Sequence, residues 1–258
     1  MTRSVMPIAA PLYPPPPYEF RRARQTWVVY EADPASIARL LPDGVAVDSG
    51  DGDVAVCAAW ACHYPVSTFG PYLEAYVVVR VVVGDERFWY QPVIVTDAEA
   101  PMAAGREVWG YGKKLAHLTW SGQDAGGPGT EQLVMTVDRP AGVRLMALSM
   151  APDRLIDGPE LMDLETAELL PTLSHRVLPG LVDELVAVDV RPKAHRGADG
   201  RLELWRGRGH VELNGTAADP WHAFRPSRVL DAFSACTDFV LPEGRVVPRA
   251  PTDSTTEE

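Results

Sequence analysis

The feature that most constrains the fold of this chain is a succession of short apolar runs, rich in valine, tryptophan and tyrosine, between residues 24 and 213. Runs of this composition, bounded by glycine, proline and aspartate, are typical of β-strands. We expect strands at 24–31, 54–63, 74–83, 87–96, 132–137, 143–150, 184–191 and 202–213. The pattern predicts a mostly β protein, with a large antiparallel sheet closed or nearly closed as a barrel.

Helices are expected to be few and short. Asp33-Pro34 is a typical helix start, with aspartate as the N-cap, and the helix should stop near Asp43-Gly44. A second helix is expected at 159–170, and a further strand at 226–247. Residues 1–20 read as a proline-rich extended arm suited to a subunit contact, and residues 250–258 as a disordered tail. No repeat or linker divides the chain, so residues 1–258 are expected to form a single domain.

Composition excludes several classes of protein. The chain has 35 acidic and 24 basic residues and a net charge of −11, which argues against nucleic-acid binding. No apolar stretch reaches the ~18 residues of a membrane span, and the N-terminal residues do not resemble a signal peptide. We therefore expect a cytoplasmic protein with no membrane partner. The three cysteines and six histidines show no metal-ligand spacing, so no metal is expected.

Lysine is rare in this chain, and its positions are informative. Only Lys113, Lys114 and Lys193 are lysines, and the other basic residues are arginines. Arginine stays protonated in proteins and cannot act as an amine nucleophile. Two adjacent lysines in such a chain indicate either amine chemistry or a solvated basic pair.

The lysine pair lies in the segment Gly105-Arg106-Glu107-Val108-Trp109-Gly110-Tyr111-Gly112-Lys113-Lys114. The segment is not a phosphate-binding loop, because lysine stands where such a loop needs Ser or Thr. A lysine amine becomes nucleophilic when burial or a neighbouring cation disfavours its ammonium form. The apolar neighbours would supply the burial, and Lys114 would supply the cation.

This segment resembles the active-site signature of the acetoacetate decarboxylase superfamily, in which a G-R-E element precedes a lysine pair. Residues 17–20, 69–74 and 230–242 extend the resemblance over nearly the whole chain. It implies a lipocalin-like antiparallel barrel around an apolar cavity that holds the lysine pair. It also implies that Lys113 is the nucleophile, Lys114 its perturbing neighbour and Glu74 the site glutamate. No cofactor is implied, and the family's assembly implies a homo-oligomer.

The chain departs from the family pattern at three positions. Gly112 replaces the proline before the lysine pair, Ala59 falls where a second acid is expected, and Ala23 falls where an arginine is expected. Arg22 and Arg24 flank Ala23 and would bind a substrate carboxylate if a bulge in the strand turned them inward.

Three further polar residues belong to the motif or follow it. Tyr111 and Glu107 are candidate substrate-binding residues, although Glu107 could equally form a structural ion pair with Arg106. His117 follows the motif and is a candidate proton shuttle, with a packed or exposed histidine as the alternative.

The favoured function is a lysine Schiff-base enzyme that decarboxylates a β-keto acid through an imine and an enamine, with Glu74 orienting the substrate or handling a proton. The alternatives are an aldolase–dehydratase acting on a 2-oxo acid such as pyruvate, a cyclase or dehydratase acting on a polyketide-like ligand, and a non-catalytic lipocalin-like binder. The alanines at 59 and 23 favour the alternatives over strict acetoacetate decarboxylation.

Overall fold

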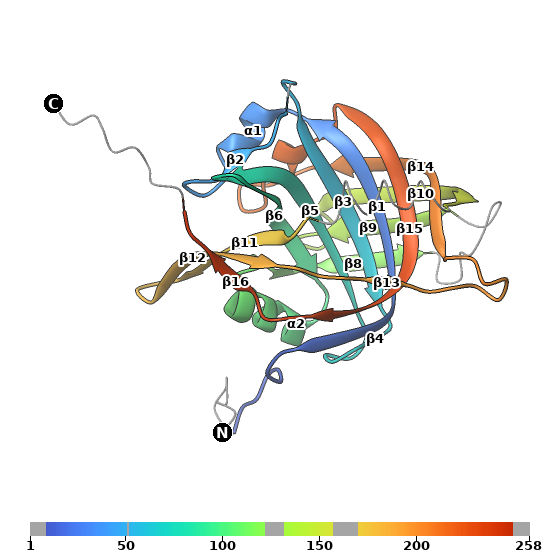
Figure 1. Ribbon diagram of the computed structural model, residues 1–258, viewed down its shortest axis with the longest axis horizontal. Helices are drawn as coiled ribbons and strands as arrows, with labels where there is room; N and C mark the ends of the chain where they lie inside the picture. The colour runs from blue at the N-terminus through green and yellow to red at the C-terminus, as the bar shows by residue number, and fades with distance from the viewer. Residues whose placement is uncertain (1–8, 51, 122–131, 157–169, 250–258) are drawn as a thin grey trace.

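The computed structural model describes residues 9–50, 52–121, 132–156 and 170–249, which form one strongly coiled, sixteen-stranded sheet (Figure 1). Twelve strands form a continuous path. In spatial order they are β16 (Arg245–Val247), β12 (Val182–Val188), β11 (Thr172–Leu178), β6 (Glu86–Thr96), β5 (Tyr72–Val83), β3 (Ala55–Tyr64), β1 (Tyr18–Ala32), β15 (Arg228–Leu241), β14 (Leu204–Leu213), β10 (Arg144–Leu155), β9 (Leu133–Asp138) and β8 (His117–Ser121).

Four two-residue strands pair beside this path: β2 (Ala46–Val47) with β5, β4 (Val66–Ser67) with β1, β7 (Lys114–Leu115) with β6, and β13 (Lys193–Ala194) with β15. Every pairing is antiparallel except β11 with β6 and β7 with β6. The mostly β, mainly antiparallel class expected from the sequence is confirmed.

The expectation of a closed barrel was wrong in one respect. The path ends at β16 on one side and at β8 on the other, and these two strands do not pair, so the described sheet is open. Closure depends on strand tilt and stagger, which alternating hydrophobicity does not specify. Both edge strands are short, which limits the backbone that they expose for pairing.

The helices differ from expectation more than the strands do. Helix α1 (Pro34–Ala38) starts where predicted, and the Asp33 carboxylate accepts hydrogen bonds from the backbone N–H groups of Ala35 and Ser36. Neither the lysine segment nor the residues before it were expected to be helical, yet α2 (Glu99–Ala104) precedes the segment and a π-helical turn, η1 (Gly105–Trp109), begins it. A 3₁₀ turn, η2 (Trp221–Phe224), was also not foreseen. Most of the helix expected at 159–170 lies outside the described residues.

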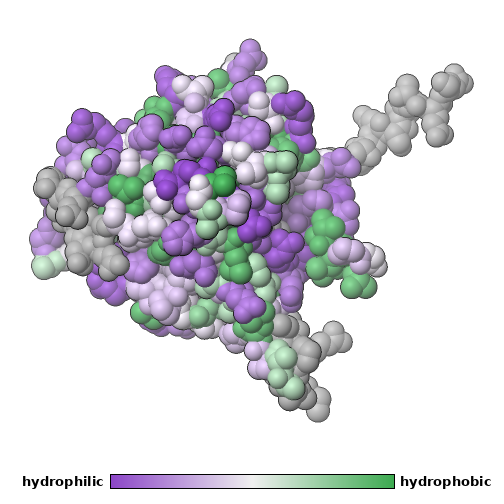
Figure 2. Space-filling view, turned by 180° about the vertical axis from the view of Figure 1, so that it is seen from behind, coloured by the Kyte–Doolittle hydropathy of each residue, from purple (hydrophilic) through white to green (hydrophobic). Residues whose placement is uncertain are grey.

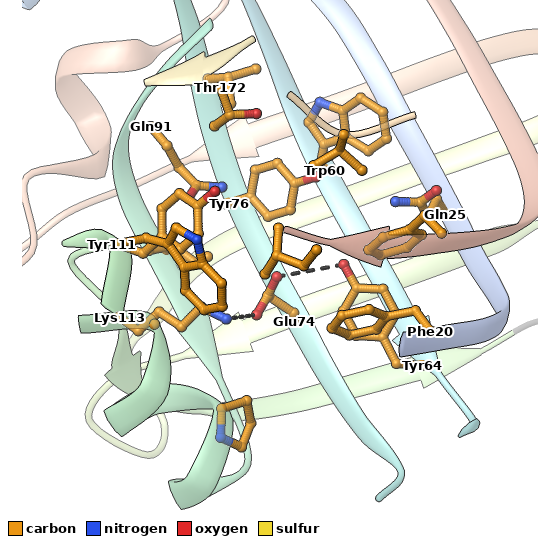
Figure 3. Close-up of a pocket in the computed structure, with 18 of the residues that line it drawn as sticks. Phe20, Gln25, Trp60, Tyr64, Glu74, Tyr76, Gln91, Tyr111, Lys113 and Thr172 are labelled. Atoms are coloured by element: carbon orange, nitrogen blue, oxygen red, sulfur yellow. Dashed lines mark hydrogen bonds and ion pairs between the residues drawn. The ribbon is translucent and has the colours of Figure 1, made fainter. Parts of the chain in front are cut away.

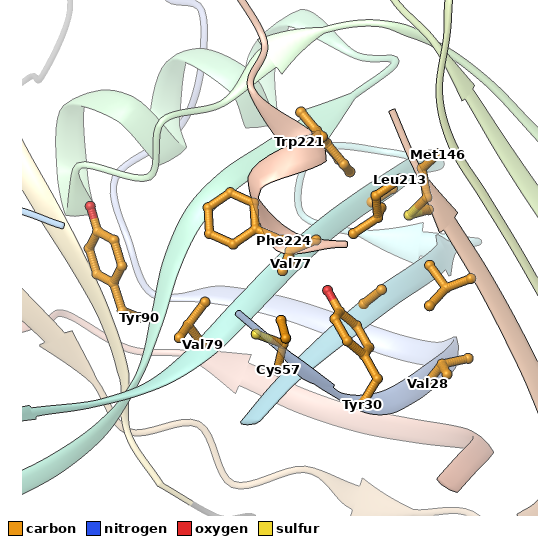
Figure 4. Packing of buried hydrophobic residues seen from close by; sticks show 14 of the residues in the cluster. Val28, Tyr30, Cys57, Val77, Val79, Tyr90, Met146, Leu213, Trp221 and Phe224 are labelled. Carbon is orange, nitrogen blue, oxygen red and sulfur yellow. The ribbon is translucent and has the colours of Figure 1, made fainter. Parts of the chain in front are cut away.

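The central strands separate two apolar regions because their side chains alternate between the two faces. One face of β1, β3 and β5 packs into a large core with Met146, Leu213, Trp221 and Phe224 (Figure 4). Ala59 belongs to this core. The other face carries aromatic side chains that surround a cavity, so the sheet forms the floor of the candidate site.

The described part of the proline-rich arm packs onto the body of the protein. Tyr13 and Tyr18 are both buried, and the Tyr18 ring lies against Phe69 and Trp109. Residues 1–8 and the tail at 250–258 lie outside the described residues. The face shown in Figure 2 is mainly hydrophilic, with apolar side chains in separate small groups, which fits the acidic composition. No described helix is long and apolar enough to cross a membrane.

Candidate active site

Lys113 lies inside the cavity, at the end of the segment that follows η1 (Figure 3). Only 6% of the residue is exposed. Its side chain passes directly over Gly105, where an added Cβ would lie 2.7 Å from Lys113 Cδ and 2.8 Å from Cε. The absence of a side chain at Gly105 therefore makes the space that the Lys113 side chain occupies.

The Lys113 amine donates a hydrogen bond to Glu74 Oε2 over 2.5 Å. Glu74 comes from β5, is 6% exposed, and its other oxygen lies 3.5 Å from the Tyr64 hydroxyl. Tyr72 and Tyr111 place their rings 5.9 and 6.0 Å from the amine. A buried, paired lysine and glutamate at this distance can exchange a proton directly.

The cavity has a volume of about 180 Å³ and largely aromatic walls, among them Phe20, Trp60, Tyr76 and Trp109. Lys113 and Glu74 are the only charged side chains among its described lining residues. The site is therefore a low-polarity pocket with one internally compensated ion pair, in which electrostatic interactions are stronger than in water.

The tyrosines around the ion pair are hydrogen-bond donors rather than bases. Burial, reinforced by neighbouring groups that include Glu74, raises the pKa of Tyr64, Tyr72 and Tyr76 well above the ordinary value. Burial likewise raises the pKa of the Cys62 thiol, to about 12. These groups stay neutral at physiological pH, and Glu74 is the only carboxyl side chain among the described lining residues.

The segment that carries Lys113 is anchored on both sides. The Trp109 indole N–H donates to the Pro242 carbonyl over 2.9 Å, and the Ser174 hydroxyl donates to the Trp109 carbonyl. The Arg106 guanidinium donates to the Lys113 carbonyl over 3.1 Å. Together, these bonds fix the backbone from which the lysine side chain reaches the cavity.

Gly110 closes the π-helical turn in a left-handed conformation, at φ 80°. A Cβ at Gly110 would lie 2.3 Å from Arg176 Cα, so the turn also approaches β11 too closely for any other residue. A π-helical turn is rare and occurs frequently at functional sites.

A family model described as acetoacetate decarboxylase matches residues 5–250 of this chain. The chain belongs to the acetoacetate decarboxylase family. The family resemblance expected from the lysine segment is thereby confirmed over nearly the whole chain.

Similar sequences and structures agree with this assignment. Acetoacetate decarboxylase of Chromobacterium violaceum is 29% identical over 256 residues, which cover 94% of this chain and 93% of the relative. Acetoacetate decarboxylase 2 of Mesorhizobium japonicum is 26% identical and covers 95% of this chain and 89% of its own length.

Among solved structures, acetoacetate decarboxylase of Legionella pneumophila superimposes with a TM-score of 0.77 at 24% identity, over 96% of this chain and 93% of the other. The enduracididine biosynthesis enzyme MppR, solved with pyruvate, gives 0.71 at 20% identity over 92% of each chain. At these identities, the solved structures show a shared fold.

The second lysine of the acetoacetate decarboxylase signature does not enter the cavity. Lys114 points to the other side of β7, where its amine donates to the Ala218 carbonyl over 2.6 Å and to Asp219 Oδ1 over 2.7 Å. Asp219 also pairs with Arg139. Lys114 was expected to act as the cation that perturbs Lys113; its amine is instead paired with Asp219, outside the cavity that holds Lys113.

Arg22 and Arg24 were expected to reach the substrate through a bulge. The bulge exists, since the register of β1 against β15 shifts between Phe20 and Ala23 and Arg22 has φ 53°. Nevertheless, both arginines line a second, polar cavity of about 490 Å³ instead of the one that holds Lys113. The bulge leaves Ala23 buried, and Gln25 is the next residue of β1 that lines the lysine cavity.

The remaining candidates divide between the cavity and the surface. Tyr111 lines the cavity, as expected of a substrate-binding residue. Glu107 is exposed and accepts a hydrogen bond from the Tyr13 hydroxyl, and His117 is exposed on β8. Neither lines the cavity, so the structure separates both from the lysine. The ion pair of Arg106 with Glu107, which was the alternative to a binding role, is not formed either, since Arg106 donates to the Lys113 carbonyl.

The aromatic walls of the cavity and Gln91, which also lines it, were not predicted from the sequence. Tyr72 and Tyr76 lie two residues on either side of Glu74 in one strand, so their positions could have been inferred from the glutamate. Gln91 follows no such rule, because it lies beside a bulge in the pairing of β5 with β6. The described residues contain no group of three or more histidines, cysteines or acids that could hold a metal ion.

Proposed function

We propose that this protein is a lysine Schiff-base enzyme that decarboxylates a β-keto acid, with Lys113 as the nucleophile and Glu74 as its proton partner. The observation that carries the proposal is the 2.5 Å contact between the Lys113 amine and the Glu74 carboxylate in an aromatic cavity. Glu74 takes a proton from Lys113, and the neutral amine attacks the substrate ketone. Protonated Glu74 then returns that proton to the departing hydroxyl, so that water leaves and an iminium forms.

The bound iminium of a β-keto acid carries a positive nitrogen and a negative carboxylate. Breaking the bond to the carboxylate moves its electron pair into the iminium, which releases carbon dioxide and leaves a neutral enamine. A cavity with few polar groups stabilises separated charges less than water does, so it favours a step that cancels them. The enamine then takes a proton that derives from water, and hydrolysis releases the ketone and the amine.

The lining supports this assignment of roles. With no arginine among the described lining residues, the substrate carboxylate has only the iminium as a counter-ion, while Glu74 repels it. The departure of carbon dioxide removes this repulsion and cancels the separated charges of the iminium and the carboxylate. A buried carboxylate and amine in contact also favour an enzyme over a passive binder, because a binder gains nothing from a proton donor and acceptor at this distance.

An aldolase–dehydratase that acts on a 2-oxo acid such as pyruvate is the second candidate. MppR shares the fold and was solved with pyruvate and with its condensation product with an aldehyde. The same lysine and glutamate would form the enamine, which would attack an aldehyde instead of accepting a proton. The two functions differ in which substrate is consumed, and not in the residues that form the imine.

The test is carbon dioxide release from a panel of 3-oxo acids, with the transfer of solvent oxygen into the product ketone as a second readout. A Schiff-base route exchanges the carbonyl oxygen with water, so product formed in ¹⁸O-labelled water should carry the label. Lys113→Arg should abolish both readouts because guanidinium cannot form an imine. Lys193→Arg is the matched control, since Lys193 is exposed on β13. Full activity of Lys113→Arg would overturn the proposal, and condensation of pyruvate with an aldehyde in place of decarboxylation would favour the second candidate.

The assembly of the protein is also a proposal. We expect a homo-oligomer, because the exposed apolar side chains of Val66, Val177 and Leu181 suit subunit contacts. Light scattering coupled to size-exclusion chromatography measures the mass directly, and a mass equal to one chain would exclude it.

A further inference from the structure

The cavity extends well beyond the ion pair. Along β5, the residues that line it are Tyr72, Glu74, Tyr76 and Val78. In the ladder with β6, Val77 pairs with Val93 and Val79 with Tyr90, so Gln91 lies in a bulge beside Val78. Four residues of strand separate this level from Glu74, which corresponds to about 13 Å. Acetoacetate does not span that length.

The Gln91 carboxamide provides an unused acceptor at the far end of the cavity. Gln91 is 7% exposed, and its side-chain oxygen is buried in the cavity wall without a hydrogen-bond partner among the described residues. Because the terminal torsion of a glutamine side chain is broad, rotation of the carboxamide turns this oxygen toward a bound molecule. Figure 3 shows the side chain among those that surround the cavity. A buried polar atom without a partner costs free energy, and a donor on a bound molecule would remove that cost.

The second glutamine that lines the cavity, Gln25, does have a hydrogen-bond partner, so the missing partner is specific to Gln91. The Gln25 side-chain oxygen accepts a hydrogen bond from the Thr237 hydroxyl over 2.9 Å. The protein therefore satisfies one glutamine internally and leaves the other for a ligand.

A row of aromatic rings stands between the two polar ends. Phe233, Trp27, Trp60 and Tyr76 are direct cross-strand neighbours on β15, β1, β3 and β5. Their rings stack, with centroid distances of 5.3, 4.5 and 5.7 Å along the row. Trp60 and Tyr76 line the cavity. Such walls favour a flat, unsaturated group that can stack on a ring or contact its edge.

Charge restricts the far group further. Apart from Lys113 and Glu74, the described lining carries no charge, and an ionised group without a partner is disfavoured in an apolar cavity. The group at the far end is therefore neutral, and it must donate a hydrogen bond because the unused Gln91 atom is an acceptor.

We propose that the substrate of this site is an extended keto acid whose far end is a flat aromatic or conjugated group bearing a neutral hydroxyl, which donates to the Gln91 carboxamide oxygen. This inference rests on the proposed function for the keto group, and it adds the chemistry of the other end. Acetoacetate would fill only the region around Lys113 and would be a poor substrate.

Equilibrium binding tests the inference separately from the imine chemistry. The probes are 4-(4-hydroxyphenyl)butan-2-one and 4-(4-methoxyphenyl)butan-2-one, which are matched in shape and differ in the donor. Calorimetry with the parent protein should show about tenfold tighter binding of the hydroxyl compound, the equivalent of one buried hydrogen bond. Gln91→Leu should remove this preference, whereas Gln25→Leu should keep it.

Each outcome bears on one proposal or the other. Equal binding of the two ketones by the parent protein, or a preference that survives Gln91→Leu, would overturn the inference even if imine formation is observed. A preference that depends on Gln91, in a protein that never forms an imine with the corresponding 3-oxo acids, would support the inference and refute the Schiff-base proposal. Turnover of acetoacetate as efficient as that of 5-(4-hydroxyphenyl)-3-oxopentanoate would also contradict the inference.

Discussion

Two cavities of this protein are lined by different residues of strand β1, and they differ in how many charged side chains they contain. The first takes Phe20 and Gln25 and contains a single buried ion pair, Lys113 with Glu74. The second takes Arg22 and Arg24 and adds Arg201, Asp199 and Glu203. None of its three arginines forms an ion pair with a described residue.

The number of charged side chains in a cavity therefore does not identify the reactive site. The polar cavity has more charged groups, but arginine cannot form an imine. The aromatic cavity has two charges, held in contact where water is largely excluded, and such an arrangement suits proton transfer. The variants below compare the aromatic cavity with the polar one, in order of decreasing expected loss of activity.

Glu74→Gln should reduce turnover by about 10²–10⁴-fold, because the Lys113 amine loses the base that accepts its proton. Circular dichroism should show an unchanged fold, since the amide occupies the same space. The matched control is Glu203→Gln in the polar cavity, which should retain parent turnover. Equal effects of the two substitutions would show that the aromatic cavity has no special role.

Gly105→Ala should reduce turnover by about 10²-fold, because the added methyl group would lie within 3 Å of the Lys113 side chain and displace the amine from Glu74. Gly112→Ala is its control within the same segment, since a Cβ there meets nothing within 4 Å. Steady-state kinetics on both variants would check this. A Gly105→Ala protein with parent turnover would mean that the position of the lysine is not critical.

Lys114→Ala should leave the pH profile of imine formation unchanged, because the Lys114 amine is paired with Asp219 outside the cavity that holds Lys113. The substitution should instead lower the free energy of unfolding by about 1 kcal/mol, through the loss of charge-assisted hydrogen bonds. Urea denaturation measures that loss. A shifted pH profile with unchanged stability would restore the view that Lys114 tunes Lys113 electrostatically.

Arg22→Gln and Arg24→Gln should change kcat/KM for a keto acid by no more than about twofold, because neither side chain reaches the lysine cavity. The measurement is steady-state kinetics on each single variant. A loss of tenfold or more, confined to substrates with a carboxylate, would show that these arginines contribute to the reactive site after all.

Much of this contrast could be predicted from local sequence. Most strands and the Asp33 cap follow from alternation and capping chemistry, and the cavity position of Lys113 follows from the family resemblance of its segment. A bulge in β1 was the predicted condition for Arg22 or Arg24 to bind the substrate, and a bulge is present. Its consequence could not be predicted, because the direction in which a bulge turns a side chain depends on the partner strands.

Other features depend on contacts between distant residues. The Asp219 partner of Lys114 is 105 positions away in the sequence, and nothing near Lys114 indicates it. The π-helical turn at 105–109 is held by Ser174 and Pro242 from other parts of the chain. The open edge of the sheet likewise results from the global stagger of strands and not from any single segment.

If the proposed function is right, Lys113, and not its neighbour, forms an imine with a keto substrate. Borohydride reduction in the presence of a 3-oxo acid traps that imine, and intact-mass measurement with peptide mapping locates it. We expect one added ligand per chain, attached to Lys113, absent from Lys113→Arg and present in Lys114→Ala. An adduct mapped to Lys114, or turnover of the substrate without any trapped adduct, would contradict it.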